Sequence, residues 1–278
     1  MTILEKQDHR PVQLRQQLEK KLLLYGSSFQ KKQQEPQPKL NVDLTCKASQ
    51  ILCLQTGTNF NNEPSNSQSL PAHFADIEKT TVIPRSHYLI LTETWMRDNC
   101  DPISIENFEC VTRQNNRSDS ETNAAGGVAI YRNLSSTSTA KILNVELSDT
   151  TRLIRNTGDV CLAEVTCFTT DTTFKMVLGA VYIHPGASIS NISVLLHQAL
   201  FPYVYNSQYV HPVMEVDTDI PILLCGDFNT NVKNDETFIK FMKDMFNVDC
   251  ASDVNNSTTL GGTTIDLTFS RHIKVETL

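Results

Sequence analysis

Pro221-Ile-Leu-Leu-Cys-Gly-Asp-Phe-Asn229 is an apolar run that leads directly into a glycine, an acid and an amide. A short apolar run of this kind predicts a buried strand, and α/β enzymes place polar groups where buried strands end. Gly226 permits a tight turn of the backbone there. Asp227 and Asn229 are two residues apart, so in an extended segment their side chains share one face and could hold a phosphate, a water molecule or a metal ion together. The alternative is an ordinary exit from a strand, because Gly, Asp and Asn are favoured in turns anyway.

Apolar runs of the same kind recur along the chain and predict many strands and few helices. The expected strands are residues 88–91, 108–112, 126–131, 160–168, 174–183, 222–225 and 264–269. Helical spacing of apolar residues predicts helices near 190–203 and 235–246, and Pro71 could open another that ends by Pro84. Helices separated by several strands favour an α/β architecture of stacked sheets with helices on the outside.

Three further polar residues follow or interrupt these apolar runs. Glu93 follows residues 88–91 and stands near Trp95, the single tryptophan of the chain, where a carboxylate suits a hard cation; a capping or surface Glu is the alternative. Tyr182 could offer its hydroxyl to a phosphate oxygen, or could simply pack at a sheet edge. Asp266 interrupts the β-prone stretch 262–269, and burying its carboxylate requires a partner.

Charge and cysteine content narrow the possible functions. Residues 1–40 carry 8 of the 24 Lys and Arg and 4 of the 31 Asp and Glu, which leaves 16 against 27, a net charge of −11, for residues 41–278. An acidic body argues against binding nucleic acid by charge alone and suits carboxylates gathered around a divalent cation. The eight cysteines include no Cys-x-x-Cys pair, so neither a zinc site nor a disulfide framework is indicated. No apolar run has the length that a membrane span needs, so we expect a soluble, intracellular protein with no membrane partner.

The first 60 residues differ in composition from the rest. Leu14, Leu18 and Leu22 predict a short amphipathic helix, and a Gln, Lys and Pro stretch typical of a linker follows through Lys39. We therefore predict a poorly ordered basic leader and linker over residues 1–60 and one catalytic domain over residues 61–278.

Five short motifs follow one another along residues 91–269. They are Leu-Thr-Glu-Thr-Trp at 91–95, Gly-Gly-Val-Ala-Ile-Tyr at 126–131, Val-Tyr at 181–182, Gly-Asp-Phe-Asn at 226–229 and Thr-Thr-Ile-Asp-Leu-Thr-Phe at 263–269. Each motif is weak alone, but the ordered set resembles the endonuclease/exonuclease/phosphatase superfamily over residues 66–271, especially the endonucleases of retrotransposons and helicase-linked mobile elements. The resemblance implies a four-layer α/β sandwich, two packed mixed sheets flanked by helices, and a phosphoester hydrolase that uses Mg²⁺ or Mn²⁺.

The resemblance also implies a role for each matched residue. Glu93 would be the chief metal ligand, and Asn66 would match the first-strand Asn that helps to bind metal and substrate. Asp227 would activate the attacking water or protonate the leaving oxygen, and Asn229 and Tyr182 would hold the phosphate. Asp266 would orient a catalytic histidine. Metal and hydrogen-bond donors would then stabilise the charge that develops on the phosphoryl oxygens.

Two departures from the family pattern complete the prediction. The segment before Asn66, residues 58–64, is polar and contains Pro64, which suits a damaged first strand. The family's final Ser-Asp-His segment is absent after Asp266, so we expect a truncated domain without its last strand and with impaired activity.

Three functions remain open from the sequence. The first is a DNA endonuclease of a mobile element, acting in the nucleus rather than the cytoplasm, with a linked helicase or reverse transcriptase as a candidate partner. The second is a phosphatase or phosphodiesterase on another phosphate ester, because one fold hosts many substrates. The third is a catalytically dead remnant or binding module, because a site without its histidine loses most of its rate.

Overall fold

The computed structural model describes residues 51–55, 83–97, 100–115, 126–145, 156–168, 173–204, 220–233, 236–259 and 261–275. Every described residue belongs to one compact unit, Val42–Leu278. Within the described ranges, no helix combines the length and the apolar character that crossing a membrane requires.

A four-stranded mixed sheet forms the first layer, with the strand order β1-β2-β4-β3. Its strands are β1 (Ile51–Gln55), β2 (Tyr88–Thr92), β3 (Phe108–Gln114) and β4 (Val128–Asn133). β1 runs parallel to β2, and the other neighbouring pairs are antiparallel. All five residues of β2 are buried, as expected for a central strand that reads as one continuous apolar run.

A six-stranded mixed sheet forms the second layer, with the strand order β5-β6-β7-β8-β10-β9. Its strands are β5 (Thr139–Leu143), β6 (Gly158–Phe168), β7 (Thr173–Ile183), β8 (Ile222–Asp227), β9 (Asp249–Cys250) and β10 (Asp266–Arg271). β7 and β8 are parallel, and the chain between them contains a helix, because parallel neighbours need a crossover connection. The predicted pair of mixed sheets is confirmed.

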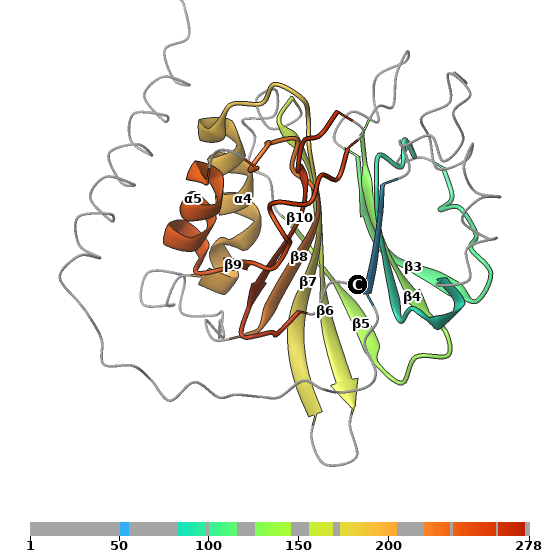
Figure 1. Ribbon diagram of the computed structural model, residues 1–278. Helices are drawn as coiled ribbons and strands as arrows, with labels where there is room; N and C mark the ends of the chain where they lie inside the picture. The colour runs from blue at the N-terminus through green and yellow to red at the C-terminus, as the bar shows by residue number, and fades with distance from the viewer. Residues whose placement is uncertain are drawn as a thin grey trace, which may run out of the picture. The chain divides into compact units, whose positions relative to one another are not determined.

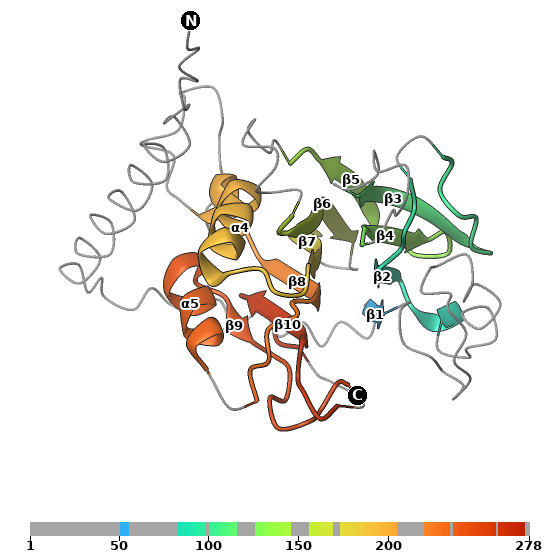
Figure 2. The same ribbon diagram turned by 90° about the horizontal axis from the view of Figure 1, so that it is seen from above.

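Two helices, α4 (Ile189–Val204) and α5 (Thr237–Phe246), cover the face of the second sheet that points away from the first (Figures 1 and 2). α5 buries Phe238, Met242 and Phe246, which repeat every four residues and so lie on one side of the helix. The helix ends at Asn247, whose left-handed backbone (φ 52°) is a common helix stop and whose N–H donates to the Lys243 carbonyl at 3.0 Å.

A layer of buried apolar side chains lies between the two sheets. Ile90 and Ile130 of the first sheet and Leu178 and Cys225 of the second belong to one buried cluster. Each large aliphatic side chain buried here contributes roughly 1.5–3 kcal/mol to the hydrophobic free energy of folding. This layer fixes the two sheets face to face, so that the ends of their strands meet.

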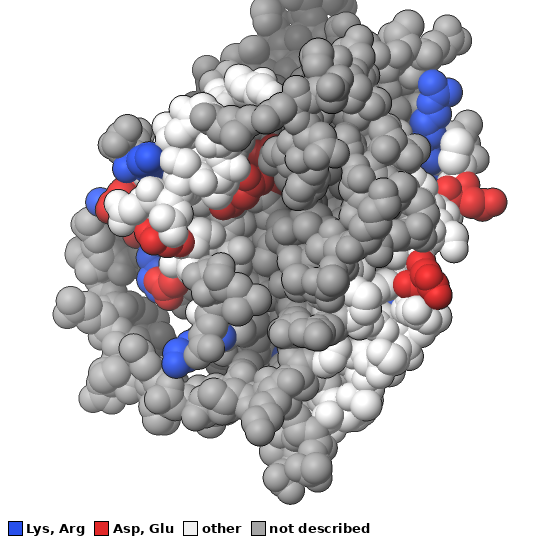
Figure 3. All heavy atoms as spheres, turned by 45° about the vertical axis from the view of Figure 1, so that its right-hand side comes forward, with Lys and Arg blue, Asp and Glu red and all other residues white. Residues whose placement is uncertain are grey.

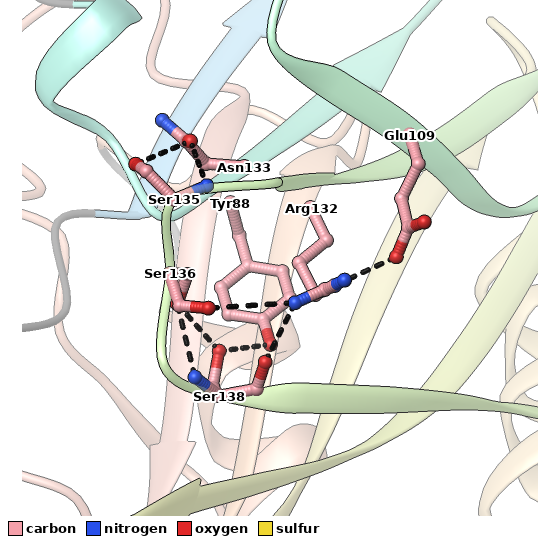
Figure 4. A network of polar contacts seen from close by, with 7 residues as sticks. All are labelled: Tyr88, Glu109, Arg132, Asn133, Ser135, Ser136 and Ser138. Atoms are coloured by element: carbon pink, nitrogen blue, oxygen red, sulfur yellow. Dashed lines mark hydrogen bonds and ion pairs between the residues drawn. The ribbon is translucent and has the colours of Figure 1, made fainter.

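A polar network secures the chain where it passes from the first sheet to the second (Figure 4). Arg132 at the end of β4 donates from Nε to Glu109 Oε1 at 2.7 Å and from Nη1 to the carbonyl of Ser138 at 2.8 Å. The buried Tyr88 hydroxyl and Ser138 Oγ are 2.6 Å apart. The network lies at the start of β2, the end opposite Glu93.

The structure differs from the sequence predictions at some positions, and other predictions fall outside the described residues. The first described strand is the apolar β1 at Ile51–Gln55, whereas the sequence placed a damaged first strand at residues 58–64, which lie outside the described ranges. β1 also lies inside the stretch 1–60 that was assigned to a leader. β5 was not predicted, because this edge strand is only five residues long and none of its residues is buried, so it lacks the continuous apolar run of the other strands. Residues 71–82 of the helix expected between Pro71 and Pro84 lie outside the described residues, so that helix stays a prediction. Residues Ile83–Arg85 form a 3-10 turn.

Candidate active site

Four polar residues form a row across the second sheet, one on each of four neighbouring strands. Asp159 pairs with Tyr182, Tyr182 with Asp227, and Asp227 with Asp266 in the strand registers. Residues directly opposed in a sheet point to the same face. Tyr182 belongs to the buried cluster between the sheets, so this row faces the first sheet at the end of that cluster.

Glu93 comes to the row from the first sheet. It follows β2 directly, and its backbone is in the left-handed region (φ 52°), which non-glycine residues seldom adopt. The Tyr182 hydroxyl donates to Glu93 Oε1 at 3.1 Å. The two sheets are therefore joined by a hydrogen bond between two of the residues that the sequence singled out.

Asp227 and Asn229 are joined by two hydrogen bonds at the end of β8. The Asn229 N–H donates to Asp227 Oδ1 at 2.8 Å, and Asn229 Nδ2 donates to Asp227 Oδ2 at 3.1 Å. The same Nδ2 donates to the Ile183 carbonyl at 2.8 Å, which ties the pair to the end of β7. Both oxygens of Asp227 thus accept hydrogen bonds, and both amide hydrogens of Asn229 have acceptors within the protein.

Gly126 and Gly127 lie between the two sheets beside this row. Both have positive φ, 96° and 90°, so glycine is the favoured residue at each. The Gly127 N–H donates to Asp159 Oδ2 at 2.8 Å, and the Gly126 carbonyl accepts the Trp95 N–H at 2.8 Å. The first two residues of the predicted strand 126–131 therefore lie outside the strand, and β4 itself starts at Val128.

Burial and mutual repulsion shape the electrostatics of the site. Burial raises the pKa of Tyr182, and the neighbouring carboxylates, chiefly Glu93, raise it further, so the phenol keeps its proton. Burial also raises the pKa of Glu93, although the hydrogen bond from Tyr182 opposes this effect. Burial raises the pKa of Asp266 to about 6; the hydrogen bond with Thr258 opposes this shift and the Glu93 charge adds to it.

The site has an accessible layer and a buried layer. Glu93, Asn229 and Asp266 are partly exposed, whereas Asp159, Tyr182 and Asp227 are buried. His184, also buried, meets the Tyr182 ring edge-on with their ring centroids 5.2 Å apart. A ligand would reach the accessible three first, with Tyr182 and Asp227 directly behind them.

The donor set fits a hard divalent cation. Within the described part of the chain, no three His, Cys, Asp or Glu residues gather closely enough to form a complete metal cage. Mg²⁺ does not need one, because it is usually held by one or two carboxylates and keeps several waters and substrate oxygens. The charge of Glu93 raises the pKa of Asp266, and a cation held by Glu93 would offset that repulsion.

The structure gathers most of the residues that the sequence selected. Glu93, Tyr182, Asp227, Asn229 and Asp266 converge on one end of the two sheets. Asn66 lies outside the described residues, so its role stays a prediction. Asp159 was missed. It was detectable in principle, because a lone acid opens the apolar run of β6 just as Asp266 opens β10.

Comparisons with known proteins find the same architecture. No protein-family model and no curated protein matches the chain. Among solved structures, an endonuclease/exonuclease/phosphatase family protein from Bacteroides thetaiotaomicron aligns over 79% of this chain and 82% of its own, with 12% identity and a TM-score of 0.50. A mannosyl-6-phosphatase from the same organism aligns over 79% of this chain and 84% of its own, with 10% identity and a TM-score of 0.50. The chain therefore has the fold of the endonuclease/exonuclease/phosphatase superfamily.

Proposed function

We propose that this protein is a metal-dependent phosphodiester hydrolase that nicks DNA as the endonuclease of a mobile element. One observation carries the proposal. Glu93 from the first sheet faces the row of Tyr182, Asp227 and Asp266 on the second and is hydrogen-bonded to it at 3.1 Å. This arrangement offers carboxylates for a cation and a protonated phenol for a phosphate oxygen at one place.

Each residue has a distinct part in the proposed reaction. Glu93 would hold the cation with Asp266 nearby, and the cation would stabilise the charge that develops on the phosphoryl oxygens. Asp227 is fixed by two hydrogen bonds from Asn229, which suits a carboxylate that accepts the proton of the attacking water. Tyr182 keeps its proton at neutral pH and so acts as a donor.

The surface charge is consistent with a contact to DNA that is local. On the face drawn in Figure 3, acidic and basic side chains of the described residues lie in small separate groups, and they form no broad basic area. The cation and the few donors around Glu93 would supply the contact to the phosphate.

Nicking of supercoiled plasmid with Mg²⁺ or Mn²⁺ tests the proposal. Glu93→Gln and Asp227→Asn should each lower the rate at least about a hundredfold, the usual loss for a cation ligand or a general base. Glu109→Gln is the matched control, because Glu109 is an exposed acid paired with Arg132 outside the site. Unchanged nicking in Glu93→Gln and Asp227→Asn would contradict the assignment.

A phosphatase that acts on small phosphate esters is the second candidate. A solved structure with this fold is named a mannosyl-6-phosphatase. The same preparations should be assayed with a sugar phosphate and with p-nitrophenyl phosphate. Hydrolysis of monoesters without nicking would favour this candidate, whereas a folded protein with neither activity would favour the inactive binding module.

A further inference from the structure

We propose that Asp159 is a positioning residue that sets the segment Glu93–Trp95 after β2 (the Glu93 turn) against the catalytic row of the second sheet. Asp159 accepts the N–H of the Gly126–Gly127 peptide group, and the carbonyl of the same group accepts the Trp95 N–H. The inference about position stands on geometry alone, and only its consequence for cation binding rests on the proposed function.

Asp159 is connected to the Glu93 turn by consecutive hydrogen bonds, the first of which joins the two sheets. Asp159 Oδ2, at the start of β6, accepts the Gly127 N–H at 2.8 Å. The Gly127 carbonyl accepts the Thr94 N–H at 3.2 Å, and the Gly126 carbonyl accepts the Trp95 N–H at 2.8 Å. The Gly127 N–H and the Gly126 carbonyl belong to one peptide group, so a displacement of that group moves Trp95 and the adjoining Thr94. Thr94 follows Glu93 directly, so the displacement reaches the carboxylate that would bind the cation.

The Glu93 turn needs such external support. Glu93 and Trp95 both have φ of 52°, in a region that non-glycine residues populate sparsely, and such residues persist where the surroundings hold them. Thr94 between them is buried, and its N–H is one of those bound by the glycine carbonyls. The carbonyls of Gly126 and Gly127 therefore hold the Glu93 turn in place by hydrogen bonds, and Asp159 on the second sheet holds the two glycines.

The fit around the two glycines leaves little room for adjustment. A Cβ added at Gly126 would lie 2.9 Å from Asp159 Oδ2 and 2.9 Å from His184 Cε1, and one at Gly127 would lie 2.6 Å from Thr94 Oγ1. Asp159 itself is fully buried. A change in the length of its side chain should therefore move the Gly127 peptide rather than be absorbed by solvent.

Two substitutions separate a hydrogen-bonding role from a role of the charge. Asp159→Asn keeps an oxygen acceptor at the same distance and loses the charge, whereas Asp159→Glu keeps the charge and displaces the acceptor by one methylene. Positioning predicts that Asn behaves like wild type and Glu is impaired. A direct electrostatic role of the carboxylate predicts the reverse order.

The experiment measures Mn²⁺ binding by calorimetry and amide hydrogen exchange across residues 92–97 and 126–128, with thermal unfolding of each variant. Asp159→Glu and Asp159→Ala should weaken Mn²⁺ binding about 10- to 100-fold, the usual loss when a group that orients a metal ligand is removed. They should also speed exchange at the Thr94 and Gly127 amides, while Asp159→Asn stays within about threefold of wild type. Glu164→Gln is the control on the same strand, because Glu164 pairs with Lys175 at 3.0 Å away from the site.

Each outcome decides the question. Wild-type affinity and exchange in Asp159→Ala, or an Asp159→Asn variant as impaired as Asp159→Ala, would overturn the positioning role. If Asp159→Ala does not fold, the comparison of Asn with Glu decides alone. If the wild type binds no Mn²⁺, the proposed function fails, and the exchange rates at Thr94 and Gly127 still test the position of the turn.

Discussion

Replacement of Asp266 by Asn should stabilise the protein at neutral pH and have little effect at low pH. The pKa of Asp266 is raised to about 6 in the folded protein, chiefly by burial, whereas an ordinary Asp titrates near 3.8. The folded state therefore binds this proton more tightly than the unfolded state. The resulting stability is fully present below about pH 4 and is lost as the pH rises through about 6.

The size of the effect follows from the difference between the two pKa values. A shift of about two units corresponds to about 3 kcal/mol, and solvent screening at this half-buried carboxyl reduces it to about 1–2 kcal/mol. Asp266→Asn removes the ionised form, so the free energy of unfolding at pH 7.5 should rise by that amount relative to wild type.

Urea unfolding at pH 4, 5, 6 and 7.5, with EDTA present, measures the difference between wild type and Asp266→Asn. Asp244→Asn, at an exposed position of α5, controls for the loss of one negative charge. A stability difference between wild type and Asp266→Asn that is the same at pH 4 and pH 7.5 would refute the reasoning, because the raised pKa requires the difference to grow between these values.

Three further predictions concern the turn, the phenol and the sheet crossing. Gly127→Ala should lower the free energy of unfolding by about 2–4 kcal/mol in a urea titration. The φ of Gly127 is 90°, and the added Cβ would lie 2.6 Å from Thr94 Oγ1. A smaller loss would mean that the backbone around Gly127 relaxes. Tyr182→Phe should raise the pKa of Glu93 further, since the hydrogen bond from Tyr182 lowers it, and should move the acid limb of the pH–rate profile upward; an unmoved limb contradicts this. Arg132→Ala should cost about 1–2 kcal/mol in thermal unfolding through its bond to the Ser138 carbonyl, with the activity of the folded protein retained.

Strands with a continuous apolar pattern could be predicted from the sequence. β2, β7 and β8 were expected at residues 88–91, 174–183 and 222–225, and each was found within two residues of those limits. Both helices were expected for the same reason, because α4 and α5 repeat apolar residues at helical spacing. A strand buried on both faces has a continuous run of apolar residues, and a helix buried on one side has apolar residues at helical spacing, so both can be recognised locally.

Elements that depend on partners far along the chain could not be predicted in this way. β9 consists of Asp249 and Cys250 and exists as a strand only because β10 supplies its hydrogen bonds. The predicted strand 126–131 begins only at Val128. The Gly127 N–H binds Asp159, and the carbonyls of Gly126 and Gly127 bind the Glu93 turn. Neither the short strand β9 nor the late start of β4 can be predicted from the order of apolar and polar residues nearby.

The sequence by itself determined the kinds of chemical group in the site and the strand ends that carry them: Glu93 after β2, Tyr182 near the end of β7 and Asp227 at the end of β8. The tertiary structure decided which of these groups meet. Register placed Asp159, Tyr182, Asp227 and Asp266 in one row, and the packing of the two sheets brought Glu93 within 3.1 Å of Tyr182. The physical reason is that strand register and sheet packing are set by contacts between segments distant in the chain, whereas apolar periodicity is set by neighbours.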